Sequence, residues 1–161
     1  MIRGAFILFA ILFGLNTHAA ELGGYAAVDA RLFPFDAKFP GQKSNNHPSA
    51  VVEPEVYHVS EDEKHVLTFR PFARIDYDDK ERTHVDIRQA DYLYAGDDWE
   101  LRAGVGSVFW GVTESQHLVD IINQDDSIED TDAEDKLGQP MIQLATMQDW
   151  GTLRVYYLPY F

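Results

Sequence analysis

Hydrophobic and polar residues alternate along most of this chain from residue 23 onward. In the most regular stretch, 99–110, Leu101 and Val105 fall on one side, and Glu100 and Arg102 fall on the other. Successive side chains of a β-strand point to opposite faces, so this period of two predicts a strand with one apolar face and one polar or small face. No long stretch has the period of an amphipathic helix, and the sequence therefore predicts an all-β protein.

The same pattern predicts seven strands, over residues 23–33, 51–60, 65–77, 83–95, 99–110, 141–147 and 152–160. In the fourth of these, Tyr92 and Tyr94 share parity with Asp86 and Arg88, so the alternation changes phase. A β-bulge near Gln89 to Asp91 would explain the change. Weak patterning is the alternative.

The expected connections alternate in length. Short turns at 60–64, 95–98 and 148–151 are interleaved with the connections 34–50, 78–82 and 111–140. Outer-membrane barrels join long strands by short periplasmic turns and longer external loops, although 78–82 is brief for an external loop. Several expected strands are also about twice the usual 5–6 residues, as a tilted membrane strand requires.

Aromatic residues flank many of these strand ends, where their mixed polarity suits the boundary between lipid and water. Those near the short turns are Tyr57, Tyr92, Tyr94, Trp99 and Trp150, and those near the longer connections are Phe33, Tyr77, Phe109 and Trp110. Core packing is the ordinary alternative for such residues. Together with strand length and loop rhythm, they favour an antiparallel transmembrane β-barrel over a soluble β-sandwich.

Residues 1–20 have the pattern of a secretory signal peptide. Arg3 precedes an apolar run at 5–15, and the small residues Thr17 and Ala19 precede the expected cleavage point. The run is shorter than the about 20 residues that cross a membrane as a helix, so an uncleaved anchor is the lesser alternative. We expect cleavage to leave a single barrel domain at 21–161, exported to the outer membrane.

Charge and cysteine content exclude several functions. The formal net charge of −14 makes nucleic acid a poor partner, because affinity for it rests on Lys and Arg neutralising phosphates. The chain has no cysteine, which excludes disulfides, thiolate metal sites and cysteine nucleophiles. An acidic exported protein fits the periplasm or the cell exterior.

Three segments carry a resemblance to a known family: HVDIRQADYLYAGDDWELRAGV, VFWGVTESQHLVDIINQ and EDKLGQPMIQL, at 84–105, 108–124 and 134–144. In order and spacing they resemble an uncharacterised family of Gram-negative outer-membrane β-barrel proteins. The resemblance implies a porin-type barrel longer than this chain, and it implies no reaction.

The odd strand count also bears on the size of the barrel. Bacterial single-chain barrels close with even numbers of strands, so seven strands indicate the amino-terminal part of a larger barrel. The alternative is a complete small barrel, since Phe161 is a terminal aromatic residue preceded by Leu153, Val155 and Tyr157 at alternating positions. Pro159 interrupts that pattern.

Charged residues supply the candidate pore lining. Four arginines on the polar faces of adjacent strands are expected to form a basic patch: Arg70, Arg74, Arg88 and Arg102. The long loop carries seven carboxylates within eleven positions: Asp125, Asp126, Glu129, Asp130, Asp132, Glu134 and Asp135. General porins fold a comparable loop into the barrel and set its acids against wall arginines, and similarity implies the same here. The alternative pairs the arginines with Asp76, Asp86 and Glu100 and leaves the loop as a solvated external surface.

Other chemistry finds little support in the sequence. Ser115 and His117 would point apart on a helix, and Glu114 with His117 is one pair where a carboxylate–histidine metal site needs two. The acidic loop lacks the glycine and spacing of an EF-hand, so we expect no cofactor beyond loosely bound Ca²⁺.

We therefore expect a non-enzymatic, porin-like channel for passive diffusion of small solutes or ions, with outer-membrane lipid as its partner. A homo-oligomer stays open. The alternatives are a non-conducting surface barrel whose acidic loop binds divalent cations or a partner, and a soluble periplasmic β-sandwich that binds a ligand.

Overall fold

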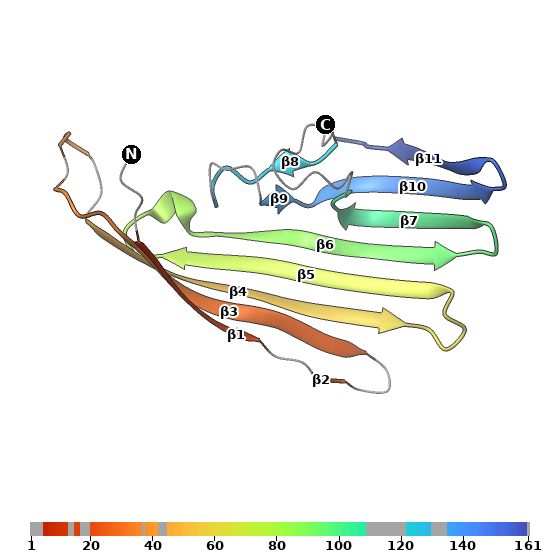
Figure 1. Cartoon of the computed structure of the whole chain (residues 1–161), viewed down its shortest axis with the longest axis horizontal. Coiled ribbons are helices and arrows are strands. Elements are labelled where there is room, and N and C mark those ends of the chain that lie inside the picture. The colour runs from red at the N-terminus through yellow and green to blue at the C-terminus, as the bar shows by residue number, and fades with distance from the viewer. Residues whose placement is uncertain are drawn as a thin grey trace.

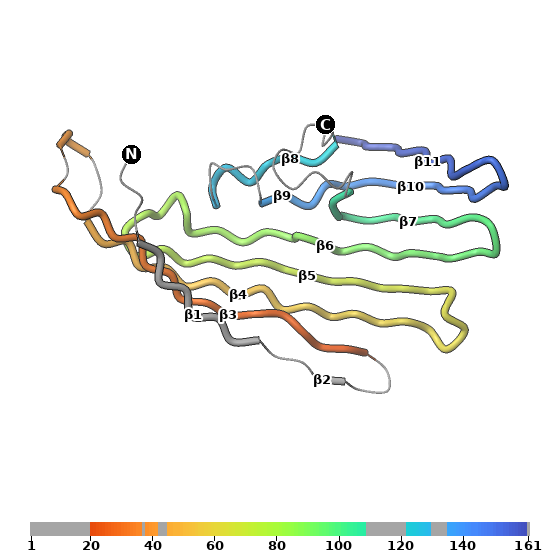
Figure 2. The backbone as a smooth tube through the Cα atoms, viewed as in Figure 1, coloured from red at the N-terminus to blue at the C-terminus, as the bar shows by residue number. Residues whose placement is uncertain are grey.

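The structure is a computed structural model of the whole chain. It describes residues 20–36, 38–41, 45–108, 122–129 and 135–160, together with the strand pairing of 5–12 and 15–16. Figure 2 follows the backbone of these parts in colour.

One antiparallel sheet makes up most of the described chain, in the order β1-β3-β4-β5-β6-β7-β10-β11, with β2 beside β3 (Figure 1). Its strands are β1 (Ala5–Leu12), β2 (Leu15–Asn16), β3 (Glu21–Leu32), β4 (Asn46–Val59), β5 (His65–Asp76), β6 (His84–Ala95), β7 (Trp99–Gly106), β10 (Gln139–Gln148) and β11 (Gly151–Tyr157). A two-stranded sheet of β8 (Gln124–Asp125) and β9 (Lys136–Leu137) and the short 3₁₀ helix η1 (Lys80–Arg82) complete the described elements.

The all-β prediction is confirmed, and each of the seven predicted strands is present with changes at its ends. The short strands β8 and β9, and the strands β1 and β2 before residue 20, were not predicted. β4 begins at Asn46 instead of 51, because its pairing with β3 continues to the pair Leu32 and Asn46. β7 ends at Gly106 instead of 110. β1 lies within the apolar run expected to be a signal peptide and pairs with β3, and the cleavage of that segment stays a prediction.

The main sheet is a single twisted layer whose two edges do not meet (Figure 1). In the described residues it is not closed into a barrel, and the barrel stays a prediction. From β3 to β7 hydrogen bonds join each strand to the next one in sequence, and β10 and β11 continue the same up-and-down order after the long connection.

The expected β-bulge lies one residue before its predicted place. Arg70 pairs with Gln89 and Pro71 with Ile87, which leaves Arg88 as the extra residue of β6. An unpaired residue reverses which positions face each side, and this explains the change of phase before Tyr92.

A second irregularity interrupts the ladder between β4 and β5. Regular pairing stops after Val52 with Ala73 and resumes at Val56 with Phe69. Pro54 and Pro71 occupy this gap, and neither has an amide hydrogen to donate to the ladder.

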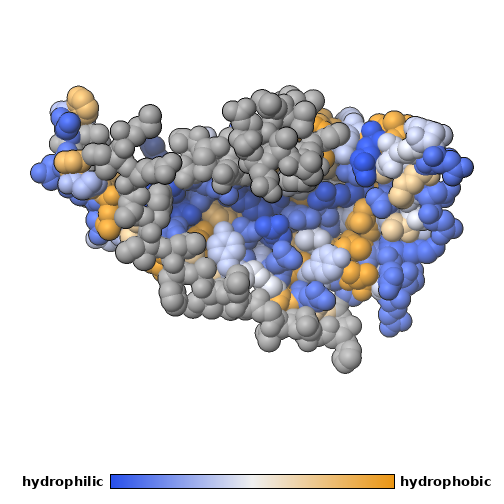
Figure 3. All heavy atoms as spheres, viewed as in Figure 1, coloured by the Kyte–Doolittle hydropathy of each residue, from blue (hydrophilic) through white to orange (hydrophobic). Residues whose placement is uncertain are grey.

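The two faces of the sheet differ in character. We call one face of the sheet the outer face and the face that carries Arg74 the inner face. On the outer face the large apolar side chains are exposed: Val52, Val56, Leu67, Phe69, Ile75, Val85, Ile87, Ile142, Leu144 and Val155. On the inner face six polar or charged residues are buried: Ser49, Glu53, Arg74, Asp76, Asp91 and Gln139. The apolar residues Ala27, Val51, Phe72, Met141 and Ala145 are buried on the same face. Figure 3 shows hydrophilic side chains gathered over the middle of the sheet. The only buried apolar cluster in the described residues is Ala27, Val51 and Phe72, with Tyr25 against it, also on the inner face.

Gly104 allows close packing between β6 and β7. Its φ of +140° favours glycine, and a Cβ at this position would lie 2.2 Å from the Ala90 carbonyl oxygen and 2.7 Å from Asp91 Cα. Gly151 has a similar φ of +143°, but a Cβ there would meet no atom within 4 Å.

We predict that Gly104→Ala lowers the free energy of unfolding by at least about 2 kcal/mol, because it adds a backbone collision to the strain of positive φ. Gly151→Ala carries the strain alone and is expected to cost about 1 kcal/mol. Denaturant titrations of the two variants measure the difference. Equal losses would show that the close approach at Gly104 has no energetic weight.

Candidate functional site

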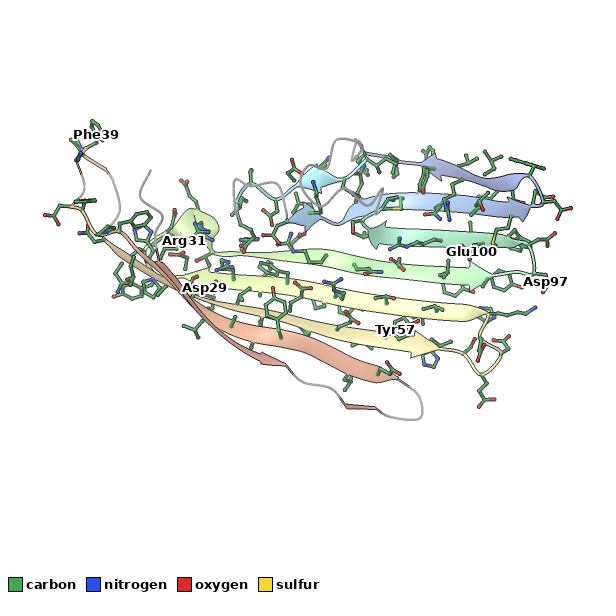
Figure 4. All side chains as sticks on the ribbon, viewed as in Figure 1. Asp29, Arg31, Phe39, Tyr57, Asp97 and Glu100 are labelled. Atoms are coloured by element: carbon green, nitrogen blue, oxygen red, sulfur yellow. The ribbon has the colours of Figure 1, made fainter. Side chains whose placement is uncertain are left out.

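The connections sort onto opposite ends of the sheet (Figure 1). The turns β4–β5, β6–β7 and β10–β11 lie at one end, and the longer connections β3–β4, β5–β6 and β7–β10 leave and enter their strands at the other. Figure 4 labels Asp29 and Arg31 on β3 near the second end, and Asp97 in a short turn at the first. The candidate site lies on the inner face toward the end with the longer connections.

The centre of this site is the side chain of Arg74 on β5. Its Nη1 lies 2.7 Å from Asp29 Oδ2 and donates to Ser49 Oγ at 2.7 Å. Its Nε and Nη2 contact the Glu129 carboxylate at 2.7 and 2.6 Å. The guanidinium thus joins β3 and β4 of the sheet to the long loop. The Arg74 side chain is only 9% exposed.

Arg88, the bulged residue of β6, forms the second link to the loop. Its Nη2 lies 2.7 Å from Asp126 Oδ2, and its Nη1 donates to the Lys136 carbonyl at 3.3 Å. The guanidinium carbon lies 4.2 Å from the centre of the Phe72 ring, a cation–π contact. This contact explains why an aromatic residue interrupts the polar face of β5.

We call residues 124–129 the docked loop, because arginines of the sheet and of η1 bind its main chain as well as its side chains. Arg31 donates to the Glu129 carbonyl at 2.9 Å, and Arg82 donates to the Ile128 and Glu129 carbonyls at 3.2 and 3.1 Å. Asp126 Oδ1 accepts from the amides of Ile128 and Glu129, which closes a turn within the loop.

The carboxyl group of Asp126 is almost fully buried, at 1% side-chain exposure. Burial by itself raises the pKa of a carboxyl group. The hydrogen bond and attraction from Arg88, with the two loop amides, outweigh that effect and hold the pKa of Asp126 below its ordinary value. Asp126 is therefore a carboxylate at neutral pH, and it pairs with Arg88 as an ion.

Arg70 and Arg102 form two further ion pairs on the inner face. Arg70 binds Glu53 and lies 3.3 Å from Glu55 Oε2. Arg102 Nε donates to Asp91 Oδ2 at 3.0 Å. A Cβ on Gly106 would lie 2.6 Å from Arg102 Nη2, so glycine leaves the space that this pair occupies.

The predicted site residues come together only in part. All four predicted arginines lie on the inner face, but each is paired with carboxylates, so they form no unpaired basic patch. Of the loop carboxylates, Asp126 and Glu129 contact the wall, Asp125 is exposed and pairs with Lys136, and Asp135 is exposed. Asp130, Asp132 and Glu134 lie outside the described residues.

The alternative set of ion pairs, in which Asp76, Asp86 and Glu100 bind the four arginines, is also present in part. Asp86 lies 3.4 Å from Arg88, as that arrangement expected, but Asp76 pairs with Arg82 at 3.7 Å. Within the described chain, Glu100 makes no ion pair with the four arginines. A fully solvated loop is wrong for residues 126 and 129, which are 2% and 6% exposed.

The sequence reading missed Asp29, Arg31, Arg82 and His84 as members of the site. Asp29 and Arg31 carried a usable signal, because they are charged at alternate positions between the apolar Val28 and Leu32. Arg82 and His84 follow a turn, where charged residues are common, so nothing marked them.

Among the described residues, no three histidine or acidic side chains are placed to hold a metal ion. Within the described chain, no helix combines the length and the hydrophobicity that a membrane crossing requires.

Replacing Arg74 tests how strongly the loop is held. We predict that Arg74→Gln destabilises the protein by about 3–5 kcal/mol, because the buried Glu129 and the partly buried Asp29 both lose the Arg74 cation. Arg154→Gln on the exposed strand β11 is the matched control and is expected to change stability by no more than about 0.5 kcal/mol. Denaturant unfolding of both variants measures this, and similar small losses would show that the Arg74 contacts are not buried ion pairs.

Comparisons with models of protein families, with curated proteins and with solved structures found no match to this chain. The resemblance to outer-membrane barrel proteins therefore stays a prediction, and the function has to be argued from the sheet and its docked loop.

Proposed function

We propose that this chain forms the wall of an outer-membrane β-barrel, in which small solutes or ions diffuse passively past the docked loop. The observation that carries the proposal is the reversed burial of the two faces. Leu67, Phe69 and Leu144 are 45–51% exposed on the outer face, while Arg74 and Asp76 are buried on the inner face.

In water this arrangement is unfavourable, because exposed apolar area costs free energy and buried charge requires partners. A sheet in a bilayer has the opposite requirement, since its outer face contacts hydrocarbon and its inner face can surround a polar lumen. Arg70, Arg74, Arg88 and Arg102 are each paired with carboxylates, and this meets the second half of that requirement. A soluble sandwich would need a second sheet against the outer face, and the described residues contain none.

Aromatic side chains at the strand ends support the same placement. At the end with short turns, the rings of His65, Tyr94 and Trp99 contact one another in sequence, each at 5.1 Å between centroids. Trp150 and Tyr77, at opposite ends, are 74% and 83% exposed. Rings of this kind occupy the interfaces of membrane barrels.

The direction of the strands bears on how such a barrel would close. β1 occupies the edge of β3 in this structure, and we propose that cleavage of the signal peptide frees that edge. The seven antiparallel strands from β3 to β11 alternate in direction, so β3 and β11 run the same way. Antiparallel closure then needs an odd number of further strands between them. We propose that this sheet is the amino-terminal part of a larger barrel, and that further strands pair with its free edges.

Transport is the use that the inner face supports best. Ion pairs of Arg70, Arg74, Arg88 and Arg102 line the wall, and the docked loop projects over it from the end with longer connections. Charged groups of both signs in a narrow passage orient polar solutes and discriminate ions by sign. A surface barrel that binds divalent cations is favoured less, because the docked loop already uses Asp126 and Glu129 to bind arginines.

Substitutions to arginine test whether the outer face contacts lipid. We predict that Leu144→Arg, in the middle of β10, costs about 2–4 kcal/mol in bilayers, whereas Ile75→Arg near the end of β5 costs about 0–1 kcal/mol. Both residues are exposed on the outer face. Denaturant unfolding from lipid vesicles measures both. If the two changes cost the same, within about 0.5 kcal/mol, the outer face contacts water and the proposal fails.

Conductance tests the transport step separately. The protein as the cell makes it, purified from membranes and added to a planar bilayer, is expected to open stepwise ion conductance. A variant that lacks residues 122–129 is expected to conduct more, since the loop narrows the passage. If a correctly inserted barrel shows no ion conductance, the transport proposal fails and the barrel has a structural role.

A further inference from the structure

His84 lies at the start of β6, beneath the docked loop, and the proposed function gives it no role. Its side chain is 18% exposed, and its ring lies 5.4 Å from the ring of Phe72. The sequence offers no sign of this position, since His84 stands at the end of the η1 turn.

The hydrogen bonds of the imidazole define which nitrogen carries a proton. His84 Nδ1 lies 2.9 Å from the Arg82 carbonyl oxygen, which can only accept, so Nδ1 is the donor. Nε2 faces two carboxylate oxygens, Glu129 Oε1 at 3.7 Å and Asp126 Oδ2 at 3.9 Å. Among the described residues Nε2 has no hydrogen-bond partner.

These contacts suit only the protonated ring. In the neutral ring with hydrogen on Nδ1, the lone pair of Nε2 would face two negative oxygens. In the imidazolium both nitrogens donate, and the positive charge lies between Asp126 and Glu129.

The charges around His84 lead to the same conclusion. The groups on the elements packed around it are the cations Arg31, Arg74, Arg82 and Arg88 and the carboxylates Asp29, Asp76, Asp86, Asp126 and Glu129. Of these groups, Asp126 and Glu129 are the carboxylates that face His84 Nε2. A proton on His84 places a positive charge beside these two carboxylates, and loss of that proton removes it.

We propose that His84 is a proton-controlled lock on the docked loop. The imidazolium holds Asp126 and Glu129 against the sheet, and deprotonation of the ring weakens that hold. Only the consequence for transport rests on the proposed function, because a looser loop widens the passage.

The lock also has an acid limit. Because the pKa of Asp126 lies below its ordinary value, its carboxylate stabilises docking above the ordinary pKa of about 3.9. That contribution is lost as the pH falls through the lowered pKa. Docking is therefore tightest between the two titrations.

The absence of cysteine makes the loop straightforward to label. We would place spin labels on Ser127→Cys in the docked loop and on Ala50→Cys in β4, in the membrane-inserted full-length protein. A single narrow distance distribution is expected at pH 6. At pH 8.5 the ratio of docked to undocked loop is expected to fall about tenfold, the effect of losing one charge-assisted contact.

Three variants separate the lock from general effects of pH. His84→Gln is expected to show the weaker docking at both pH values, and His84→Arg, with a permanent charge, the stronger docking at both. His58→Gln on β4 is the matched control and is expected to respond like the unmodified protein. If either His84 variant keeps the pH response of the unmodified protein, the proposal is overturned.

If His84→Gln does not fold, the pH response of His84→Arg decides alone, because only a lock at His84 makes that response disappear. The labels report distance and not conductance, so the outcome does not depend on the channel. A pH-dependent loop in a silent barrel would keep the lock and remove the transport proposal.

Discussion

Buried ion pairs are the constraint on which this structure depends. A single-layer sheet has no second layer to cover it, so each strand presents one face to each side. Here the inner face carries the charges, and Arg74 is its central member because it binds two neighbouring strands and the docked loop at once. A buried guanidinium is tolerated only with partners of this kind. The exposed apolar face and the inward loop both follow from this arrangement.

The docked loop shows how an acidic segment becomes part of a wall. Asp126 uses one oxygen to fix its own turn and the other to bind Arg88, so a single side chain shapes the loop and attaches it. From the docked loop, Arg31 and Arg82 bind main-chain carbonyl oxygens, and this positions the main chain without adding negative charge. Phe72 supports the arrangement from below, since its ring lies under the Arg88 guanidinium.

The alternation of the sequence predicted the strands well and the site only in part. Period two gave the strands and their faces, because side chains alternate regardless of what covers the sheet. The change of phase at Tyr92 revealed the bulge but placed it one residue late, since only the pairing of Pro71 with Ile87 identifies Arg88 as the extra residue. Ion-pair partners were the least predictable. Arg70 binds Glu53 from the neighbouring strand, and Arg74 binds Glu129 from a distant loop, and neither pairing can be inferred from spacing along the chain.

The gap in regular pairing at the level of Pro54 and Pro71 changes how β4 and β5 are held together midway along their length. Neither proline donates a main-chain hydrogen bond, and regular pairing is missing across this level. On the inner side of the same level, Arg70 of β5 binds Glu53 and Glu55 of β4. Side-chain electrostatics thus take the place of amide hydrogen bonds along one seam. Cohesion of β4 and β5 at that seam therefore depends more on ionic strength than it does where main-chain hydrogen bonds join the same two strands.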